Sequence, residues 1–161
     1  VSTSVVGQNT GDNDRFVRKY WELFEISSDW ENYQRTTNTS IFYGGLEQVI
    51  YWQNGNGQMS QLPSYRGLNP DLDYALNKRK IGFVIHRMGN LPCTIAHAKL
   101  FDQNGAVLVP KNPKDSSIIW NFISSTEFNN AVRTFDNKTG VTPKTLIKPS
   151  FIINNEFCSF I

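Results

Sequence analysis

The first third of the chain combines a polar turn segment with an apolar stripe. Residues 7–13 (Gly-Gln-Asn-Thr-Gly-Asp-Asn) have the glycine and asparagine content of a loop. Large apolar side chains then recur at helical spacing, at Phe16, Tyr20 and Phe24. Three side chains just ahead of this stripe can cap a helix: Asp12, Asn13 and Asp14. The pattern predicts a short helix from about Arg15 to Phe24.

The middle of the chain has the composition of β-strands. Residues 40–43 and 47–53 are rich in Ile, Val, Tyr, Phe and Trp, and two glycines separate them. The glycine-rich run at residues 54–57 follows a predicted strand and does not lead into a helix. We therefore interpret it as a reversal of the chain.

Further apolar stretches predict more strands, at residues 81–86, 94–101 and 106–109. The last two of these stretches flank the tripeptide Gln103-Asn104-Gly105. Asn-Gly between two strand-like runs is the strongest short signal for a β-hairpin. The sequence therefore predicts that residues 94–101 pair with residues 106–109.

In the last third the apolar period changes from two residues to the helical period. One predicted helix carries Ile118, Ile119, Phe122 and Ile123, with Asp115 or Ser116 as its cap. A second carries Phe128, Val132 and Phe135, with Thr126 as its cap and an end near Gly140 and Pro143. A helix, several strands and two helices in this order predict an α+β fold.

The composition is that of one globular domain. The chain has 161 residues, of which 39% are hydrophobic and 19% charged, enough apolar content for a sizeable core. No apolar run reaches the length of a membrane span, and no signal peptide opens the chain. Because the chain begins at Val1 and stops within an apolar stretch at residues 157–161, we expect a single domain, residues 1–161, excised from a longer cytoplasmic polypeptide.

The nitrogen and sulfur ligands for a zinc ion are few. A structural zinc site needs four of them. All of Cys93, Cys158, His86 and His97 would therefore have to converge. Two reduced cysteines and no metal is the simpler interpretation.

The charge is unevenly distributed along the chain, although the net charge is only +2. Residues 1–31 hold three basic and six acidic side chains, whereas residues 32–99 hold seven basic and three acidic ones. A positive middle segment is compatible with a face turned toward phosphate groups. An ordinary mixed surface explains the charge equally well.

Catalytic motifs are missing from the sequence. There is no Gly-x-Ser-x-Gly turn and no glycine-rich loop ending in Lys-Ser or Lys-Thr. Adenine-N6 methylation would need an Asn/Asp-Pro-Pro-aromatic motif. Residues 69–71 (Asn-Pro-Asp) and 112–114 (Asn-Pro-Lys) lack the second proline and the aromatic residue. We therefore expect no catalytic residue and no cofactor in this chain, and we disfavour an autonomous hydrolase or nuclease.

The polar side chains are better suited to recognition. Arg and Lys can bridge guanine O6 and N7, and Asn or Gln can bridge adenine N6 and N7. Asn and Gln concentrate in the predicted loops, and the cluster Lys78-Arg79-Lys80 and the segment 86–90 place cations at both ends of the predicted strand 81–86. A solvated strand edge protected by charge is the alternative interpretation.

Four segments, in order, resemble one known family. Residues 10–18 read TGDNDRFVR and residues 20–22 read YWE, similar to the TGDNDRF-R-WWE signature found after the methylase core of type IIG restriction-modification methylases and related phage-defence methyltransferases. Residues 42–45 (FYGG) and 49–55 (VIYWQNG) resemble the family's WYG and VVNWENDG stretch. Here the acidic turn of the family is replaced by QNGNG at residues 53–57, which leaves any role of the turn carboxylates open.

The resemblance continues through the second half of the chain. Residues 87–93 read RMGNLPC, followed by FD at 101–102 and AVLVPK at 106–111, as in the family's RMGNLPC, FD and AVI-PK elements. Residues 119–133 (IWNFISSTEFNNAVR) are similar to IWAFCSSPEFNEAVR, with Thr126 in place of the proline. The first and last segments are the most specific, and the likeness covers roughly residues 7–151.

The resemblance implies a target-recognition domain similar in kind to the TaqI-like specificity domain. Its fold would be a curved, mostly antiparallel or mixed β-sheet with packed helices. Its partners would be double-stranded DNA and the methylase core of the same polypeptide, which binds S-adenosylmethionine and flips an adenine out of the duplex. This domain would contact phosphates for position and base edges for sequence.

Charge and loop position select the candidate DNA contacts. The candidate base readers are Arg79, Arg87, Asn90 and Lys99, and the candidate phosphate contacts are Arg15, Arg18, Lys78 and Lys80. A structural role in capping and loop closure is expected for the signature residues Thr10, Gly11, Asp12, Asn13 and Phe16.

The sequence is also compatible with two other classes of function. One is an interaction domain that holds another subunit of a defence complex through apolar surface. The other is a carbohydrate-binding module, which would also use exposed Trp, Tyr and Asn side chains.

Overall fold

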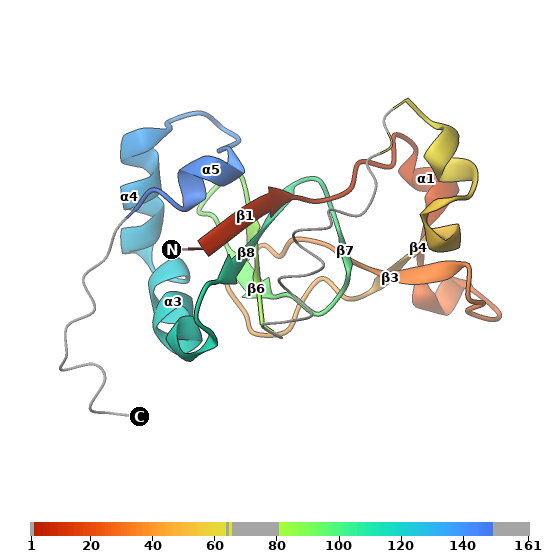
Figure 1. The fold of residues 1–161 in the computed structure, drawn as a ribbon, viewed down its shortest axis with the longest axis horizontal. Helices are drawn as coiled ribbons and strands as arrows, with labels where there is room; N and C mark the ends of the chain where they lie inside the picture. The colour runs from red at the N-terminus through yellow and green to blue at the C-terminus, as the bar shows by residue number, and fades with distance from the viewer. Residues whose placement is uncertain (1, 64, 66–80, 150–161) are drawn as a thin grey trace.

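In the computed structural model, which describes residues 2–63, 65 and 81–149, eight strands form two four-stranded sheets. The first sheet has the order β1 (Ser2–Val6), β8 (Gly105–Pro110), β5 (Phe83–His86) and β6 (Cys93–Ile95). The second has the order β2 (Val17–Lys19), β4 (Gln48–Tyr51), β3 (Trp30–Gln34) and β7 (Leu100–Phe101). Figure 1 shows the helices α3 (Ser116–Ile123), α4 (Thr126–Phe135) and α5 (Pro143–Leu146) at one end of the molecule, and α1 (Asn13–Phe16), β3 and β4 at the other.

The strand pairing is mostly antiparallel. All three neighbouring pairs of the first sheet are antiparallel, as are β2–β4 and β3–β4 in the second. The pair β3–β7 is parallel, so the second sheet is mixed. The expected α+β class and the mostly antiparallel or mixed strand pairing are therefore confirmed, but the strands form two sheets where one was expected.

The helices cover one face of the first sheet. Alternate residues of a strand face opposite sides of a sheet. Phe83 and Ile85 of β5 accordingly face the helices, where they pack in one core cluster with Phe128 and Val132 of α4. Val84 belongs to a separate cluster on the other side of the strand, with Phe101, Val107 and Val109. The near-continuous apolar run of β5 and β8 reflects this burial on both faces.

Both helices predicted in the last third are present, but the cap of the second helix differs from the prediction and that of the first makes no side-chain bond. The side chain of Ser125, not that of Thr126, accepts the hydrogen bond from Phe128 N at 3.3 Å at the start of α4. Asp115 stands at the N-cap of α3 without a side-chain cap bond, because the 3-10 turn η4 (Pro113–Asp115) leads directly into the helix. α4 ends at Phe135, before Gly140, and Pro143 opens α5, as its fixed φ permits at a first helical position.

The predicted helix from Arg15 to Phe24 is wrong beyond its first turn. Asp12 caps α1 as predicted, since its Oδ1 accepts from Arg15 N at 3.1 Å. The helix ends at Phe16 because the next three residues pair with β4, with Val17 opposite Ile50. A 3-10 turn, η1 (Tyr20–Glu22), follows. Tertiary strand pairing thus overrides a stripe that had helical spacing.

The predicted hairpin around Asn104 is wrong, although its turn is present. Asp102 O accepts from Gly105 N at 2.9 Å, and Asp102 Oδ1 accepts from Asn104 N at 2.7 Å. The strand before the turn, β7, nevertheless joins β3, whereas the strand after it, β8, joins β1 and β5. The turn therefore passes the chain from one sheet to the other.

The rest of the middle region follows the prediction in part. β5 and β4 lie within the predicted strands at residues 81–86 and 47–53. The chain turns at residues 54–57 through η2 (Gln53–Gly55) and η3 (Gln58–Gln61). β3 was not predicted. Residues 40–43 are not a strand but run beside β6, where Ile41 N donates to Cys93 O at 3.0 Å.

The two sheets are joined by the side chain of Gln34, which is fully buried at the end of β3. Its Nε2 donates to the carbonyls of Gly44 at 3.0 Å and Ile95 at 2.8 Å. Its Oε1 accepts from the backbone N of His97 at 2.8 Å and of Ala98 at 3.4 Å. One amide thus holds the end of β6, the segment leading to β7 and the loop after β3.

We expect Phe16→Ala to lower the free energy of unfolding by about 3–5 kcal/mol, because it removes a buried ring from the core of the second sheet (the second core), which Phe16 forms with Tyr33, Ile50 and Leu100 among others. Phe16 is 1% exposed, whereas Phe24 is 107% exposed. The matched variant Phe24→Ala should change stability by less than about 0.5 kcal/mol. Urea unfolding of both variants checks this. Similar losses for both would indicate that one helix carries the two rings.

We expect Gln34→Leu to lower the free energy of unfolding by about 3 kcal/mol or more. The leucine fills a similar volume but leaves backbone groups of Gly44, Ile95 and His97 without partners, and each such buried group costs about 1–3 kcal/mol. The control is Gln103→Leu, at an exposed position of the turn before β8. Equal urea midpoints for the two variants would contradict the joining role of Gln34.

Candidate functional site

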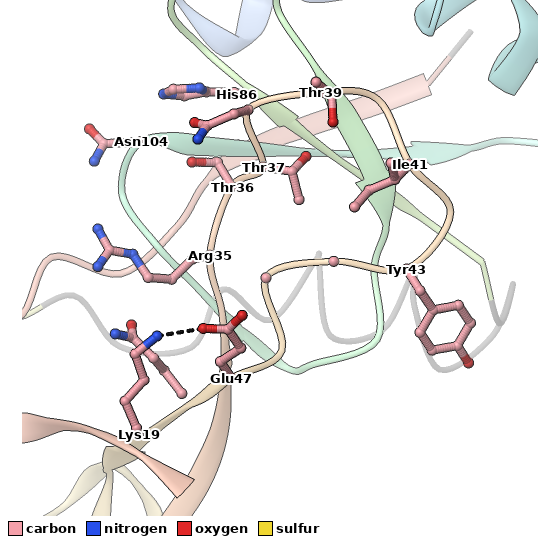
Figure 2. A pocket seen from close by; sticks show the side chains of 14 residues that line it. Lys19, Arg35, Thr36, Thr37, Thr39, Ile41, Tyr43, Glu47, His86 and Asn104 are labelled. Carbon is pink, nitrogen blue, oxygen red and sulfur yellow. Dashed lines mark hydrogen bonds and ion pairs between the residues drawn. The ribbon is translucent and has the colours of Figure 1, made fainter.

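A hollow of about 640 Å³ lies beside the junction of the two sheets. The loop that connects β3 to β4 supplies most of its lining. The other lining side chains come from β2, β4, β5 and the turn before β8, as Lys19, Gln48, His86 and Asn104 respectively. Figure 2 shows the side chains of Arg35, Lys19 and Asn104 along one side of this hollow. Residues distant in sequence are therefore brought together here.

Arg35 is the cation whose position is best defined. Its Nε lies 3.0 Å from Oδ2 of Asp102, whose side chain is only 4% exposed, whereas that of Arg35 is 44% exposed. A buried carboxylate on one side of the junction thus orients a guanidinium that reaches solvent. The terminal nitrogens of Arg35 have no partner among the residues that the structure describes. They form a fork of donors directed away from Asp102.

Lys19 is held more loosely. Its ammonium group forms an ion pair with Glu47, and the two side chains are 34% and 64% exposed. The ammonium also lies 5.2 Å from the ring centroid of Trp21. An exposed ion pair of this kind contributes little to stability, because solvent screens it. Lys19 is therefore free to exchange Glu47 for another anion.

His86 is the titratable group at the end of β5. Burial lowers the pKa of its imidazole below the ordinary value, and the nearby carboxylate of Asp102 opposes this shift. A neutral imidazole presents one donor and one acceptor. With Lys19 and Arg35 each facing a carboxylate, the hollow is close to electrically balanced and offers both donors and acceptors.

The loop that lines the hollow is fixed to the first sheet by backbone bonds and ring contacts. Arg35 N donates to Gly45 O at 2.8 Å, and Ile95 N donates to Phe42 O at 3.2 Å. Phe42 stacks on Trp120 of α3 with a centroid distance of 4.5 Å. Tyr43 stacks on His97 at 4.2 Å and remains exposed. The loop is therefore a defined wall of the hollow.

Two of the candidate phosphate contacts, Arg18 and Arg15, lie on β2 and on the preceding helix α1. Arg18 lines a smaller adjoining hollow together with Lys19 and Gln48. Its Nη1 donates to backbone carbonyls of Val17, at 2.8 Å, and Asp14. Arg15 is exposed and donates to Gln58 Oε1 at 2.9 Å.

The candidate base readers that the structure describes do not line the hollow. Arg87 donates through Nε to Val141 O at 2.8 Å and through Nη1 to Gln103 O at 3.3 Å, so its guanidinium ties loops together. Asn90 and Lys99 are exposed and do not line the main hollow. Lys78, Arg79 and Lys80 lie outside the described residues.

The signature residues 10–16 have structural positions in the described region. Thr10 is buried and its hydroxyl donates to Oδ1 of Asn13. Gly11 has a φ of +70°, which favours glycine. Asp12 caps α1, and Phe16 fills the second core.

Sequence reasoning missed most of the residues that line the hollow, among them Lys19, Arg35, Asn38, Gln48 and Asn104. A signal existed for one part: residues 35–40 (Arg-Thr-Thr-Asn-Thr-Ser) form an uninterrupted run of polar side chains that can bind a ligand. No local pattern indicated that this run would lie beside Asn104, because that proximity depends on the crossing between the sheets.

No group of three or more potential metal ligands is present among residues 2–63, 65 and 81–149. Cys93 is buried and not in a disulfide, and burial raises the pKa of its thiol to about 11. Its proposed partner in a zinc site, Cys158, lies outside the described residues. Among the described residues, no helix is long and apolar enough to cross a membrane.

Comparison with known proteins does not assign the chain to a family. No family model matches it, and no curated protein matches it.

We expect Arg87→Ala to lower the free energy of unfolding by about 1–3 kcal/mol, because charge-assisted bonds to two carbonyls are lost. The control is Lys99→Ala, which removes a cation from an exposed position and should cost less than about 0.5 kcal/mol. Thermal or urea unfolding measures both changes. If Arg87→Ala is as stable as Lys99→Ala, the bonds of Arg87 do not stabilise the fold, and Arg87 is again a candidate for contact with DNA.

Proposed function

We propose that this chain is the DNA target-recognition domain of a cytoplasmic adenine-N6 methyltransferase of the restriction-modification or phage-defence type. The observation that carries the proposal is the half-exposed guanidinium of Arg35, oriented by the buried Asp102 within an open hollow. The motif resemblance over residues 7–151 supports the same function independently. The expected likeness to the curved sheet of such domains is part of this proposal.

The two terminal nitrogens of Arg35 are placed so that they can donate hydrogen bonds to nucleic acid. Asp102 occupies Nε and leaves the two terminal nitrogens as a planar fork. Such a fork can donate both bonds to guanine O6 and N7 or to two oxygens of a phosphate. Holding the guanidinium in place beforehand reduces the side-chain entropy lost on binding. An arginine fixed in this way can therefore discriminate between positions on a duplex.

Arg18 and Lys19 supply charge next to this fork. Lys19 lines both hollows, and Arg18 lines the smaller one. A phosphate can replace Glu47 as the partner of Lys19, since an exposed pair is worth only about 0–1 kcal/mol. This edge of the domain would then contact the DNA backbone, while the hollow faces the base edges.

The remaining chemistry belongs to the methylase core of the same polypeptide. That core would bind S-adenosylmethionine and the flipped adenine. The domain described here would bind the same duplex and select which adenine enters the active site.

A second candidate function is supported by a different surface. Residues 20–26 expose four large apolar side chains: Tyr20, Trp21, Phe24 and Ile26. Acidic side chains accompany them, including Glu22 and Glu25, and these would repel phosphates. An exposed aromatic group with an acidic border fits a protein partner, so this surface favours an interaction domain within a defence complex.

We expect the chain to bind a mixed-sequence duplex with an affinity that falls steeply as salt rises, since cations that contact phosphates release counterions. Fluorescence anisotropy across a salt series measures the slope of log K against log salt. Arg18→Gln and Lys19→Gln should each reduce this slope by about 0.9.

The control variant for this experiment is Lys114→Gln, which removes the same charge from an exposed residue of η4 that lines neither hollow. Its slope should equal that of the wild type. An equal reduction in all three variants would indicate nonspecific attraction. Absence of salt-sensitive duplex binding would overturn the proposal, and binding to glycans or to a protein partner would then favour one of those functions.

A further inference from the structure

Three side-chain amides line the main hollow, from Asn38, Gln48 and Asn104. None of them has a side-chain hydrogen-bond partner among the residues that the structure describes. Asn38 is exposed, Gln48 and Asn104 are half-buried, and Figure 2 shows the amide of Asn104 on the same side of the hollow as the guanidinium of Arg35. Within the described region, these amides are therefore not used to hold the fold together.

The buried edge of the hollow adds two unsatisfied polar atoms. Gln48 Oε1 and Thr37 Oγ1 are buried and have no partner among the described residues. A buried polar atom without a hydrogen bond is costly, and each such atom calls for an explanation. Both residues line the hollow, and a ligand that donates a hydrogen bond would remove this cost once these side chains turn toward it.

Besides its two cations, the hollow presents neutral amides. Lys19 faces Glu47, and the Nε of Arg35 faces Asp102, so that the terminal nitrogens of Arg35 remain for a phosphate or a guanine. Each amide adds a donor and an acceptor in one plane. Adenine presents the complementary pair in the major groove, an N6 amine that donates and an N7 that accepts.

We propose that this hollow reads an adenine of the target duplex through the amides of Gln48, Asn104 and Asn38. The inference rests on the proposed function and specifies which base the domain selects. Gln48 and Asn104 approach the hollow from different sheets, at the start of β4 and at the turn before β8. Asn38 lies on the loop that connects β3 to β4. This base-reading set shares no residue with the candidates Arg79, Arg87, Asn90 and Lys99 that were selected from the sequence.

The experiment begins with selection of preferred duplexes from a random pool by the wild-type chain, followed by anisotropy on the selected duplex. Replacing one selected adenine by 7-deazaadenine removes the N7 acceptor and keeps the base pair. We expect this change, and each of the variants Asn104→Ala, Gln48→Ala and Asn38→Ala, to weaken binding by about 5- to 150-fold. The variants should also lose their preference for adenine at one position of the selected sequence.

Two controls separate base reading from effects on folding. Asn130→Ala changes an exposed asparagine of α4 that does not line the hollow, and it should leave affinity and preference unchanged. Asn104→Asp keeps the shape of the side chain but removes its donors, and it should also lose the adenine preference. Thermal unfolding of each variant checks that the fold is retained.

The outcomes distinguish this inference from the proposed function. If the chain binds no duplex at low salt, both the recognition function and the inference are overturned. If it binds duplex with the expected salt dependence, but 7-deazaadenine and the amide variants bind as the unmodified pair does, only the adenine-reading inference is overturned. Loss of affinity without loss of adenine preference in the variants would also overturn it.

Discussion

The arrangement of this protein depends on one buried amide. Gln34 is fully enclosed at the end of β3 in the second sheet, and both of its polar atoms bond to backbone groups of β6 in the first sheet, of the segment leading to β7 and of the loop after β3. A primary amide suits this position, because it can donate twice and accept twice without carrying a charge into the interior. These hydrogen bonds add to the apolar packing between the two sheets, in which Phe101 of β7 lies in one cluster with Val84, Val107 and Val109 of the first sheet.

The next residue of the same strand connects this junction to the candidate site. Side chains alternate along an extended chain, so Gln34 points into the junction and Arg35 points toward the hollow. Asp102 lies where β7 ends, and its backbone N donates to Gln34 O at 3.0 Å while its carboxylate holds Arg35. Gln34 therefore holds the junction between the sheets. Asp102, which is bonded to the backbone of Gln34, orients the guanidinium of Arg35 that a ligand would contact.

Much of the fold could be predicted from the sequence, because it depends on local patterns. The two C-terminal helices, the buried strand β5 and the Asp12 cap all follow from periodicity and capping chemistry. The predictions of a helix through Phe24 and of a hairpin at Asn104 were wrong for one shared reason. In both places a strand pairs with a strand that is distant in the sequence. The candidate site could not be found for the same reason. Arg35, Gln48 and Asn104 become neighbours only through the crossing between sheets.

The loop between β3 and β4 is held by backbone hydrogen bonds and by side chains that flank residues 36–39, among them the rings of Phe42 and Tyr43. Backbone groups of Arg35, Ile41 and Phe42 carry its contacts with Gly45 and β6, and the polar residues at 36–39 lie outside the three core clusters. Substitutions at these positions therefore alter what the hollow presents at little cost to folding. Mutational drift, or deliberate exchange of this short segment, can generate new ligand preferences on an unchanged scaffold.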